Sequence, residues 1–510
     1  MINSSFFNKS TACFTVALGA AAVAPLHIDA AKKNIVFIEL DDLNFRFMNK
    51  LGGGFTQTPN MDDLATNGVY FSNALAQGAM CGPSRNTLIT GLYGHMLGYY
   101  HNGNLGSIPT GTWTLGPAMK RAGYTTSWIG KTHVRPITKI GEDTLSVAER
   151  MTRNMGFDFA IALVGHIAIE NEVRKSPNPD ALSSPYYDFL KSVGKWDSFK
   201  NDCINRVPVT SLSDDEYLDG FYSNKAIEWL ENNKNLTNPF FLWLNLSCPH
   251  GPDDVPQPYH DMYPNDLPAP LSSDFGNAVI PTPLQLPKSV IDTASLNLTR
   301  RGHAASVSYV DSRIGKVIQK LKDIGKYDDT VIFFFSDQGV MKGNHGKYKK
   351  GSLFNEISNP SLIIACPKYF RKDVVEDSPV ELIGIINTVL DIAEASQEDK
   401  SAPKSKSFLP LLTGTGQYNK QYAFTEIEGA RLCVDNRYRF YSTKEGNLLY
   451  DMQNDPAELN NIADSHPKIV KRMQNAINKW LTNSRPVLPA YFLRQGKDEE
   501  LIRKDVKLHF

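Results

Sequence analysis

Lys33-Asn-Ile-Val-Phe-Ile-Glu-Leu40 is a short, mostly apolar stretch rich in β-branched residues, and Asp41 and Asp42 follow it directly. This composition predicts a buried β-strand. Ligands of open α/β sheets bind beside the carboxyl ends of the strands. We therefore expect the two adjacent carboxylates at a ligand-binding edge of a sheet.

The same pattern recurs along the chain. Strand-like runs at residues 125–130, 239–246 and 330–335 each lead into polar residues, and helical patterns lie between them. Strands that alternate with helices predict a parallel sheet with helices on both faces. The expected fold class is α/β, with a large, mainly parallel sheet flanked by helices. Helices are expected at residues 58–68, 222–232 and 304–324, and a further strand at 69–73.

A polar segment at residues 400–407 marks an expected domain boundary. We assign residues 31–400 to a large α/β domain and residues 401–510 to a smaller α+β C-terminal subdomain. The elements expected in this subdomain are strands at 438–441 and 447–450 and a helix at 468–483.

The N-terminus has the pattern of an export signal. Lys9 precedes an apolar run at residues 12–24, which is too short to span a membrane comfortably, and the small residues Ala22 and Ala24 suit a signal-peptidase site, with Ala30 as another. We expect residues 1–30 to be a signal peptide and the protein to be periplasmic or secreted. A disordered tail or an uncleaved anchor is the alternative, and no later stretch predicts a transmembrane helix.

Charge and cysteine content narrow the class of protein. Lysine plus arginine equals aspartate plus glutamate at 54 each, without the basic excess of a nucleic-acid binder, so no nucleic-acid partner is expected. Of the six cysteines, Cys13 lies in the predicted signal peptide, and the other five cannot all pair. Buried free thiols are the plainer expectation, although disulfides among four of them are open.

Two strand ends offer oxygen ligands for one cation. Asp41 and Asp42 repel each other unless a cation lies between them, and hard divalent cations prefer carboxylate ligands. Asp337 and Gln338 follow the strand-like run at 330–335 in the same way. A shared metal site is therefore plausible at one edge of the sheet.

Cys81 lies at the expected start of a helix. Pro83 suits the first helical turn, the helix N-terminus favours negative charge, and Arg85 falls on the same face as Cys81. A thiol in such surroundings is expected to be activated. On these grounds Cys81 is a thiolate nucleophile, a redox cysteine or a packed thiol.

The residues around Cys81 resemble the motif of a known family. Cys81-x-Pro83-Ser84-Arg85, followed by Leu88 and Thr90-Gly91, is similar to the type I sulfatase motif of the alkaline phosphatase superfamily. The stretches Asp41-Asp42-Leu43-Asn44 and Cys81-Gly82-Pro83-Ser84-Arg85 look most like its iduronate-sulfatase side. The resemblance covers roughly residues 33–485. Other motifs in the family's order are Gly130-Lys131-Thr132-His133, Pro249-His250-x-Pro252, Asp337-Gln338-Gly339, His345-Gly346 with Lys350, and the ending at residues 448–456.

The resemblance implies a chemistry for Cys81. A maturation enzyme, formylglycine-generating or anaerobic, would convert it to formylglycine, an aldehyde that hydrates to a diol. One diol oxygen would attack sulfur while the alcohol leaves, and the other would let the covalent sulfate be expelled. Residues 31–400 would then be the sulfatase catalytic domain.

Roles for the other motif residues come from the same resemblance. Calcium, or alternatively magnesium, would bind Asp41, Asp42, Asp337 and Gln338, although many relatives have Asn or His in place of Gln338. Arg85 would hold the diol and a metal-bound carboxylate, and Lys131 and Lys350 would neutralise the sulfate. His250 would protonate the leaving alcohol, and His133 would take the diol proton.

We expect a sulfated carbohydrate, a glycosaminoglycan or algal polysaccharide fragment attacked from its end. Irregular segments at 95–110, 135–215 and 252–297, with Glu426 and Glu428, would line the sugar pocket. The alternatives are a phosphonate or phosphate ester hydrolase of the same superfamily and a non-catalytic binder of sulfated glycans.

Overall fold

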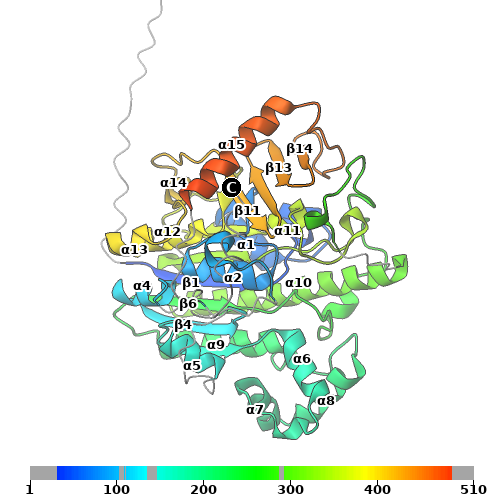
Figure 1. Ribbon diagram of the computed structural model, residues 1–510. Helices are drawn as coiled ribbons and strands as arrows, with labels where there is room; N and C mark the ends of the chain where they lie inside the picture. Colours follow the sequence, from blue (N-terminus) through cyan, green and yellow to red (C-terminus); the bar gives the residue numbers. More distant parts are fainter. Residues whose placement is uncertain (1–31, 103–107, 109–110, 135–145, 287–291, 485–510) are drawn as a thin grey trace, which may run out of the picture. The chain divides into compact units, whose positions relative to one another are not determined.

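Strand β1 (Asn34–Leu40) lies inside a mainly parallel sheet, in the computed structural model that describes residues 32–102, 108, 111–134, 146–286 and 292–484 (Figure 1). Its neighbours β6 (Phe240–Asn245) and β7 (Thr330–Ser336) both run parallel to it. Val36 and Ile38 enter the hydrophobic core on one face, and Ile35 and Phe37 enter the core on the other. Burial on both faces explains why the strand is almost continuously apolar.

The described strands of this sheet have the order β5-β4-β6-β1-β7-β8-β2-β9. All neighbours are parallel except β8, which is antiparallel to β7 and β2. The predicted α/β fold class with a mainly parallel sheet is therefore confirmed. The other bounds are β2 (Gly68–Phe71), β4 (Thr125–Lys131), β5 (Phe159–Leu163), β8 (Leu362–Ala365) and β9 (Val374–Glu376).

Helices build the two cores on either side of the sheet. The core that contains Val36 includes residues of α1 (Pro59–Thr66), α6 (His166–Lys175), α7 (Pro185–Ser192), α8 (Trp196–Asn205), α9 (Leu218–Asn232) and α10 (Thr293–Asp323). The core that contains Phe37 includes residues of α2 (Cys81–Thr90), α4 (Leu115–Arg121), α5 (Val147–Arg153), α12 (Gly384–Ile392) and α14 (Leu409–Thr413). Of three short helices, α13 (Gln397–Ser401) contacts α12, whereas α3 (Gly94–Leu97) and α11 (Asn355–Ser358) contribute to two other cores that include residues 423–450.

A four-stranded antiparallel sheet follows in the C-terminal part, and α15 (Pro467–Asn483) packs against it (Figure 1). The sequence predicted only the last two of its strands. A separate two-stranded pair, β3 (Ala74–Leu75) and β10 (Val380–Glu381), contacts its first strand. The boundary near residue 400 stays a prediction. The sheet consists of β11 (Ala423–Ile427), β12 (Ala430–Val434), β13 (Tyr438–Thr443) and β14 (Asn447–Asp451).

The expectation of irregular structure at 135–215 is wrong for most of residues 146–215. This segment supplies the edge strand β5 and the helices α5 to α8. In α6 the buried positions are His166, Ile169, Glu170 and Val173, which have helical spacing. Two of these four residues are polar, so the sequence does not show the helical repeat of hydrophobic residues. For the same reason α10 begins at Thr293 rather than at residue 304, because its first turns are polar.

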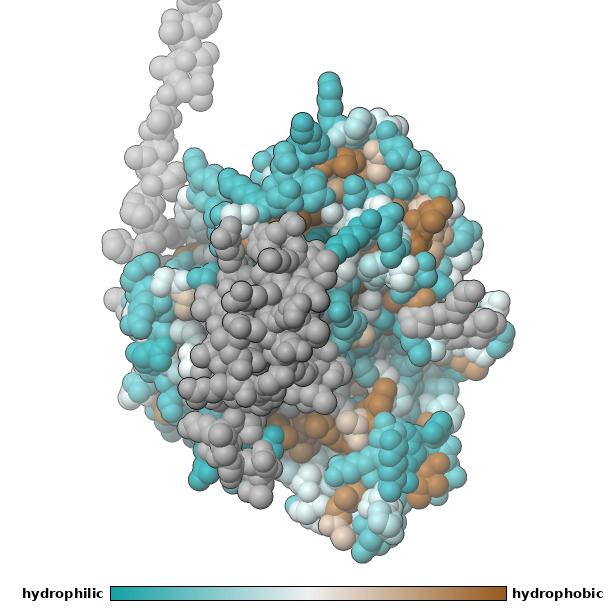
Figure 2. Space-filling view, in the orientation of Figure 1, coloured by the Kyte–Doolittle hydropathy of each residue, from teal (hydrophilic) through white to brown (hydrophobic). Residues whose placement is uncertain are grey.

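Several predictions fall outside the described residues: the signal peptide at 1–30, parts of the segments at 95–110, 135–215 and 252–297, and residues 485–510. Within the described chain, no helix has both the length and the apolarity to cross a bilayer. The face in Figure 2 is mostly hydrophilic, with hydrophobic residues in separate areas. The five described cysteines are buried free thiols.

Candidate active site

The carboxyl ends of β1 and β7 bring the predicted metal ligands together. Asp41 and Asp42 follow β1, Asp337 and Gln338 follow β7, and the Asp337 amide donates to the Leu40 carbonyl at 3.1 Å. All four polar side chains are buried. One carboxylate oxygen from each aspartate lies within 4.8 Å of the other two. Asp42 has a φ of 68°, so the chain turns sharply there and keeps both adjacent carboxylates at the sheet edge.

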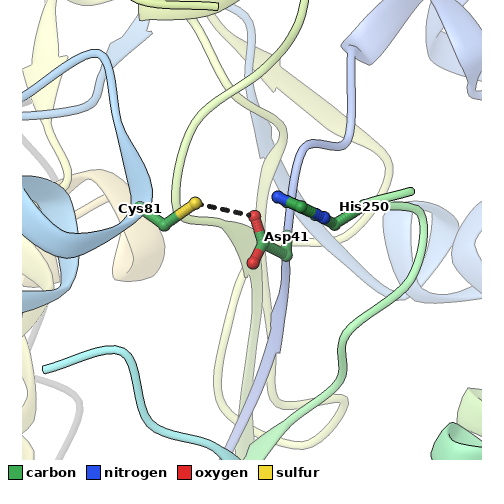
Figure 3. A group of neighbouring side chains, drawn as sticks. All are labelled: Asp41, Cys81 and His250. Atoms are coloured by element: carbon green, nitrogen blue, oxygen red, sulfur yellow. Dashed lines mark hydrogen bonds between the residues drawn. The ribbon is translucent and has the colours of Figure 1, made fainter. Parts of the chain in front are cut away.

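Helix α2 delivers Cys81 to the same place. Cys81 is its first residue, and Ser84 fixes the helix to β7 because its hydroxyl donates to the Asp337 carbonyl at 2.6 Å. The Cys81 sulfur lies 3.3 Å from Asp41 Oδ1, with His250 on the other side of Asp41 (Figure 3).

The expected activation of the Cys81 thiol is wrong. Burial raises its pKa to about 11, and the carboxylates of Asp337 and Asp42 act in the same direction. Lys350 lowers it, but not enough to offset burial. Among the protein groups alone, the unmodified side chain is therefore a protonated thiol at neutral pH, which disfavours the thiolate alternative.

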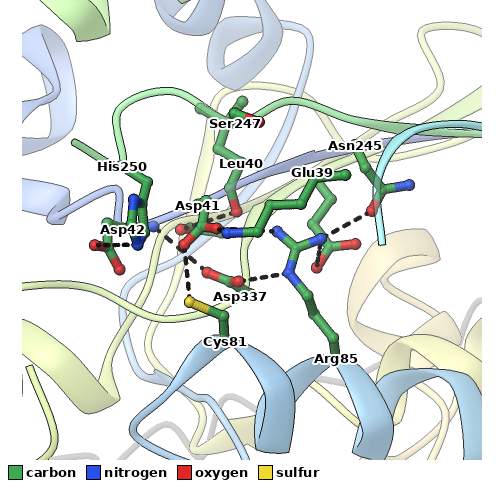
Figure 4. Close-up of polar contacts among 12 residues, drawn as sticks. Glu39, Leu40, Asp41, Asp42, Cys81, Arg85, Asn245, Ser247, His250 and Asp337 are labelled. Carbon is green, nitrogen blue, oxygen red and sulfur yellow. Dashed lines mark hydrogen bonds and ion pairs between the residues drawn. The ribbon is translucent and has the colours of Figure 1, made fainter. Parts of the chain in front are cut away.

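Arg85 supplies the buried counter-charge, four residues after Cys81 on α2. Its Nε donates to Asp337 Oδ2 at 2.7 Å, and its Nη1 lies 3.1 Å from Asn245 Oδ1 and 3.3 Å from Glu39 Oε1 (Figure 4). Sequence analysis missed Glu39 and Asn245. An acidic residue within an otherwise apolar strand was the available signal for Glu39, since a buried carboxylate needs a partner.

Two lysines lie among the carboxylates. Lys350 Nζ lies 2.5 Å from Asp42 Oδ1 and 2.8 Å from Cys81 Sγ, and Lys131 Nζ is paired with Asp41 Oδ2. Burial lowers the pKa of Lys131 to about 7, and the charge of Lys350 adds to this effect. Lys350 is different: burial lowers its pKa, but Asp42 and other acidic partners outweigh burial and raise it.

Both predicted histidines border the cluster. His250 Nε2 lies 3.9 Å from Asp42 Oδ2, and its loop is fixed by Asp219, which accepts from the Ser247 and Cys248 amides at 2.7 Å each. Asp219 was not predicted. His133 has a buried Nδ1 without a partner among the described residues. Burial, with the nearby positive charges, lowers the pKa of His250 to about 3 and that of His133 to about 2.

The donor set suits a hard cation. Gln338 Nε2 faces the oxygens of Asp41 and Asp42, while its Oε1 is buried without a partner in the described structure. Three clustered carboxylates are ligands that calcium or magnesium prefers, and a half-turn of the Gln338 amide would bring its unsatisfied oxygen toward them. The residues present therefore fit the implied ion.

Comparison with known proteins agrees with this geometry. The family described as Sulfatase matches residues 33–395, and the family described as N-sulphoglucosamine sulphohydrolase, C-terminal, matches residues 343–485. The chain belongs to the sulfatase family. This confirms the resemblance and the enzyme class, a sulfatase that hydrolyses sulfate esters.

Individual relatives extend over most of this sulfatase. An arylsulfatase of Clostridium perfringens is 26% identical over 463 residues, covering 85% of this chain and 91% of the relative. Iduronate 2-sulfatase of Homo sapiens is 27% identical over 379 residues, covering 69% of this chain and 62% of the relative.

Solved structures share the fold. A phosphonate monoester hydrolase of Agrobacterium radiobacter aligns with a TM-score of 0.74 at 22% identity, covering 89% of this sulfatase and 96% of that chain. A protein in complex with its substrate D-glucosamine-2-N,6-O-disulfate aligns with a TM-score of 0.69 at 21% identity, covering 89% and 98%.

Proposed function

We propose that this sulfatase removes sulfate from the ends of sulfated carbohydrates, using a formylglycine made from Cys81 and one divalent cation, calcium. The observation that carries the proposal is the position of the Cys81 sulfur. It lies 3.3 Å from a carboxylate of the candidate metal set and 2.8 Å from the Lys350 ammonium. A reacting atom at this position is next to the groups that stabilise an anionic sulfate.

Conversion of Cys81 is supported by its surroundings. Because burial raises its pKa to about 11, the thiol itself is a poor nucleophile at neutral pH. An aldehyde hydrate at this position supplies an oxygen nucleophile and a route for sulfate release. Cys81 is only 1% exposed, so the maturation enzyme we propose as a partner would act on the chain before it folds.

Each neighbouring residue has a role in this proposal. Asp41, Asp42, Asp337 and Gln338 would hold the cation, which when bound would polarise the sulfate oxygens and favour ionisation of the nucleophile. Arg85 holds Asp337 in place through its 2.7 Å bond. Lys131 and Lys350 neutralise sulfate oxygens.

Proton transfers are assigned to the two histidines. The half-buried His250 protonates the leaving alcohol, and a bound sulfate ester raises its pKa because it adds negative charge. His133, whose Nδ1 has no partner among the described residues, accepts the proton that accompanies sulfate release.

A carbohydrate substrate is supported by relatives and by polar groups near α2. The names of the human relative and of one solved complex refer to iduronate and to a glucosamine disulfate. Asn102 accepts from the Gly82 amide at 3.0 Å, and the preceding His101 lies 3.3 Å from Glu428. We infer that these polar residues recognise sugar hydroxyls beside the start of α2. Glu426 instead accepts from His95 and is buried.

Export to the periplasm or the medium remains part of the proposal, since such polymers lie outside the cytoplasm. Phosphonate ester hydrolysis is the second candidate, favoured by the TM-score of 0.74 with a phosphonate monoester hydrolase. A non-catalytic glycan binder would have no need for the complete set of Lys131, His133, His250 and Lys350, because mere binding of sulfate requires no proton transfer by the two histidines.

The test is a substrate panel for enzyme matured in its natural host. It contains sulfated mono- and disaccharides that differ only in sulfate position, an aryl sulfate and an aryl phosphonate. We expect one sugar and one sulfate position to have the highest kcat/KM. Poor turnover of every sugar, with good turnover of the aryl phosphonate, would favour the second candidate.

A further inference from the structure

A second cluster of metal-ligand residues lies on α6 and on the loop after β6. It consists of His166, Glu170 and Asp254, with the Tyr217 hydroxyl between two of them. One ligand atom from each of the first three residues lies within 4.8 Å of the other two. The exposed fractions are 2% for His166, 8% for Glu170 and 7% for Asp254. None of these residues belongs to the catalytic cluster described above.

The hydrogen bonds of Tyr217 fix the tautomer of His166. The Tyr217 hydroxyl donates to Asp254 Oδ1 at 3.1 Å and lies 3.2 Å from His166 Nδ1. With Asp254 ionised, the single proton of Tyr217 is used on Asp254, so Tyr217 accepts at His166 and Nδ1 carries the ring proton. The His166 Nε2 lone pair then faces Glu170 Oε1 at 3.6 Å. Two acceptors face each other, so a proton or a cation belongs between them.

The carboxylate of Glu170 is only weakly compensated, because Arg174 and Arg206 lower its pKa by less than burial raises it. In the described part of the chain, no donor lies within hydrogen-bond distance of it, and neither Glu170 nor Asp254 forms an ion pair with lysine or arginine. Burial accordingly raises the pKa of Glu170 to about 7 and that of Asp254 well above its usual range. Burial also lowers the pKa of His166 to about 3, so the imidazole is neutral and able to ligate a metal.

We propose that His166 Nε2 and the carboxylates of Glu170 and Asp254 bind a second divalent cation, zinc, separate from the catalytic ion. One imidazole nitrogen and two carboxylates suit zinc better than calcium, which prefers oxygen ligands alone. Tyr217 completes the arrangement because ligating histidines donate their other ring N–H to a group that orients them. His166 and Glu170 are one helical turn apart, so they point to the same side of α6.

This ion would fix parts of the chain that carry catalytic residues. Asp254 lies four residues after His250 in the same loop. Gly165, just before His166, packs against Lys131, since a Cβ there would lie 2.9 Å from Lys131 Cε. Zinc would therefore tie α6 to the His250 loop and act as a structural ion next to the active site.

The competing explanation is a proton, with a neutral Glu170 donating to His166 Nε2. Measurement of the bound zinc distinguishes a metal ion from a shared proton. The full-length protein is treated with chelator, equilibrated with zinc chloride, freed of excess metal and analysed by mass spectrometry of the elements. We expect the wild type to retain one more zinc per chain than Glu170→Gln, and zinc to raise the Tm of the wild type more than that of the variant.

Glu172→Gln is the matched control, because Glu172 lies on the same helix but accepts from Tyr187. It should keep the wild-type zinc content. Tyr217→Phe should weaken zinc binding about 10- to 100-fold, since the ring loses its orienting partner. If Glu170→Gln does not fold without metal, His166→Asn replaces it.

Zinc-edge anomalous diffraction from wild-type crystals should place a peak between His166, Glu170 and Asp254. Equal zinc content in the wild type and Glu170→Gln, or no anomalous peak at this cluster, would overturn the proposal. Both readouts are independent of turnover, so they do not depend on the proposed function of Cys81.

Discussion

The Lys350 ammonium lies 2.8 Å from the Cys81 sulfur. The same nitrogen lies 2.5 Å from Asp42 Oδ1, so one positive charge contacts both the proposed reacting residue and the candidate metal set. A sulfate bound at residue 81 would also be attracted to this charge. Such an attraction is strong in a buried, water-poor site.

Replacing Lys350 by methionine should lower kcat about 10²- to 10³-fold, the usual cost of losing one preorganised group that stabilises developing charge. Steady-state kinetics on an aryl sulfate provides the measurement. Lys349→Met is the control, because the neighbouring Lys349 is exposed. Equal loss in both variants would show that the position of the charge is irrelevant.

Arg85 should matter for stability as well as activity. It is 1% exposed and pairs with Asp337 and Glu39, which are fully buried. Arg85→Met removes the direct ion-pair partner of both carboxylates and should lower the free energy of unfolding by about 3–5 kcal/mol, as for other broken buried pairs. Urea denaturation measures this. Arg437→Met, which breaks an exposed pair with Asp451, should change stability little.

His250→Gln should affect substrates according to their leaving groups. A sugar alcohol is a poor leaving group that needs a proton, whereas a nitrophenol does not, so the variant should lose about 10²- to 10⁴-fold on the sugar sulfate and far less on the nitrophenyl sulfate. Comparison of kcat/KM for both substrates tests the role. An equal loss on both would assign His250 to binding instead.

Chelation should remove activity and calcium should restore it. The carboxylates of Asp41, Asp42 and Asp337 lie within 4.8 Å of one another. Their negative charges repel one another, and a bound cation relieves this repulsion. Activity after dialysis against chelator, and after adding back calcium, magnesium or zinc separately, identifies the ion. Restoration by zinc alone would contradict the proposed oxygen-ligated calcium site.

Local sequence patterns predicted the strands that carry the candidate active site better than they predicted the other helices and strands. The strands that end just before Asp41 and Asp337 were expected because both are nearly continuous apolar runs followed by carboxylates. That these ends meet follows from a parallel sheet, and the structure brings them together. The catalytic roles of the residues at this edge stay predictions.

What the sequence did not predict depends on tertiary surroundings. Helix α6 buries the polar residues His166 and Glu170, which conceal its hydrophobic periodicity. Glu39 and Asn245 become partners of Arg85 only when β1, β6 and α2 pack together. The helix position of Cys81 predicted activation, but burial outweighs it and raises the pKa. Local sequence does not specify burial of this kind.

The most direct test of the account is the mass of the tryptic peptide of residues 51–85 from active enzyme made in its natural host. Formylglycine at position 81 replaces the sulfur and two hydrogens of cysteine by one oxygen. We predict that the fraction of this peptide with the lower mass is proportional to the specific activity of each preparation. We also predict that the Cys81→Ala variant is folded but inactive. Full activity in a preparation whose residue 81 is entirely unmodified cysteine would contradict the central claim.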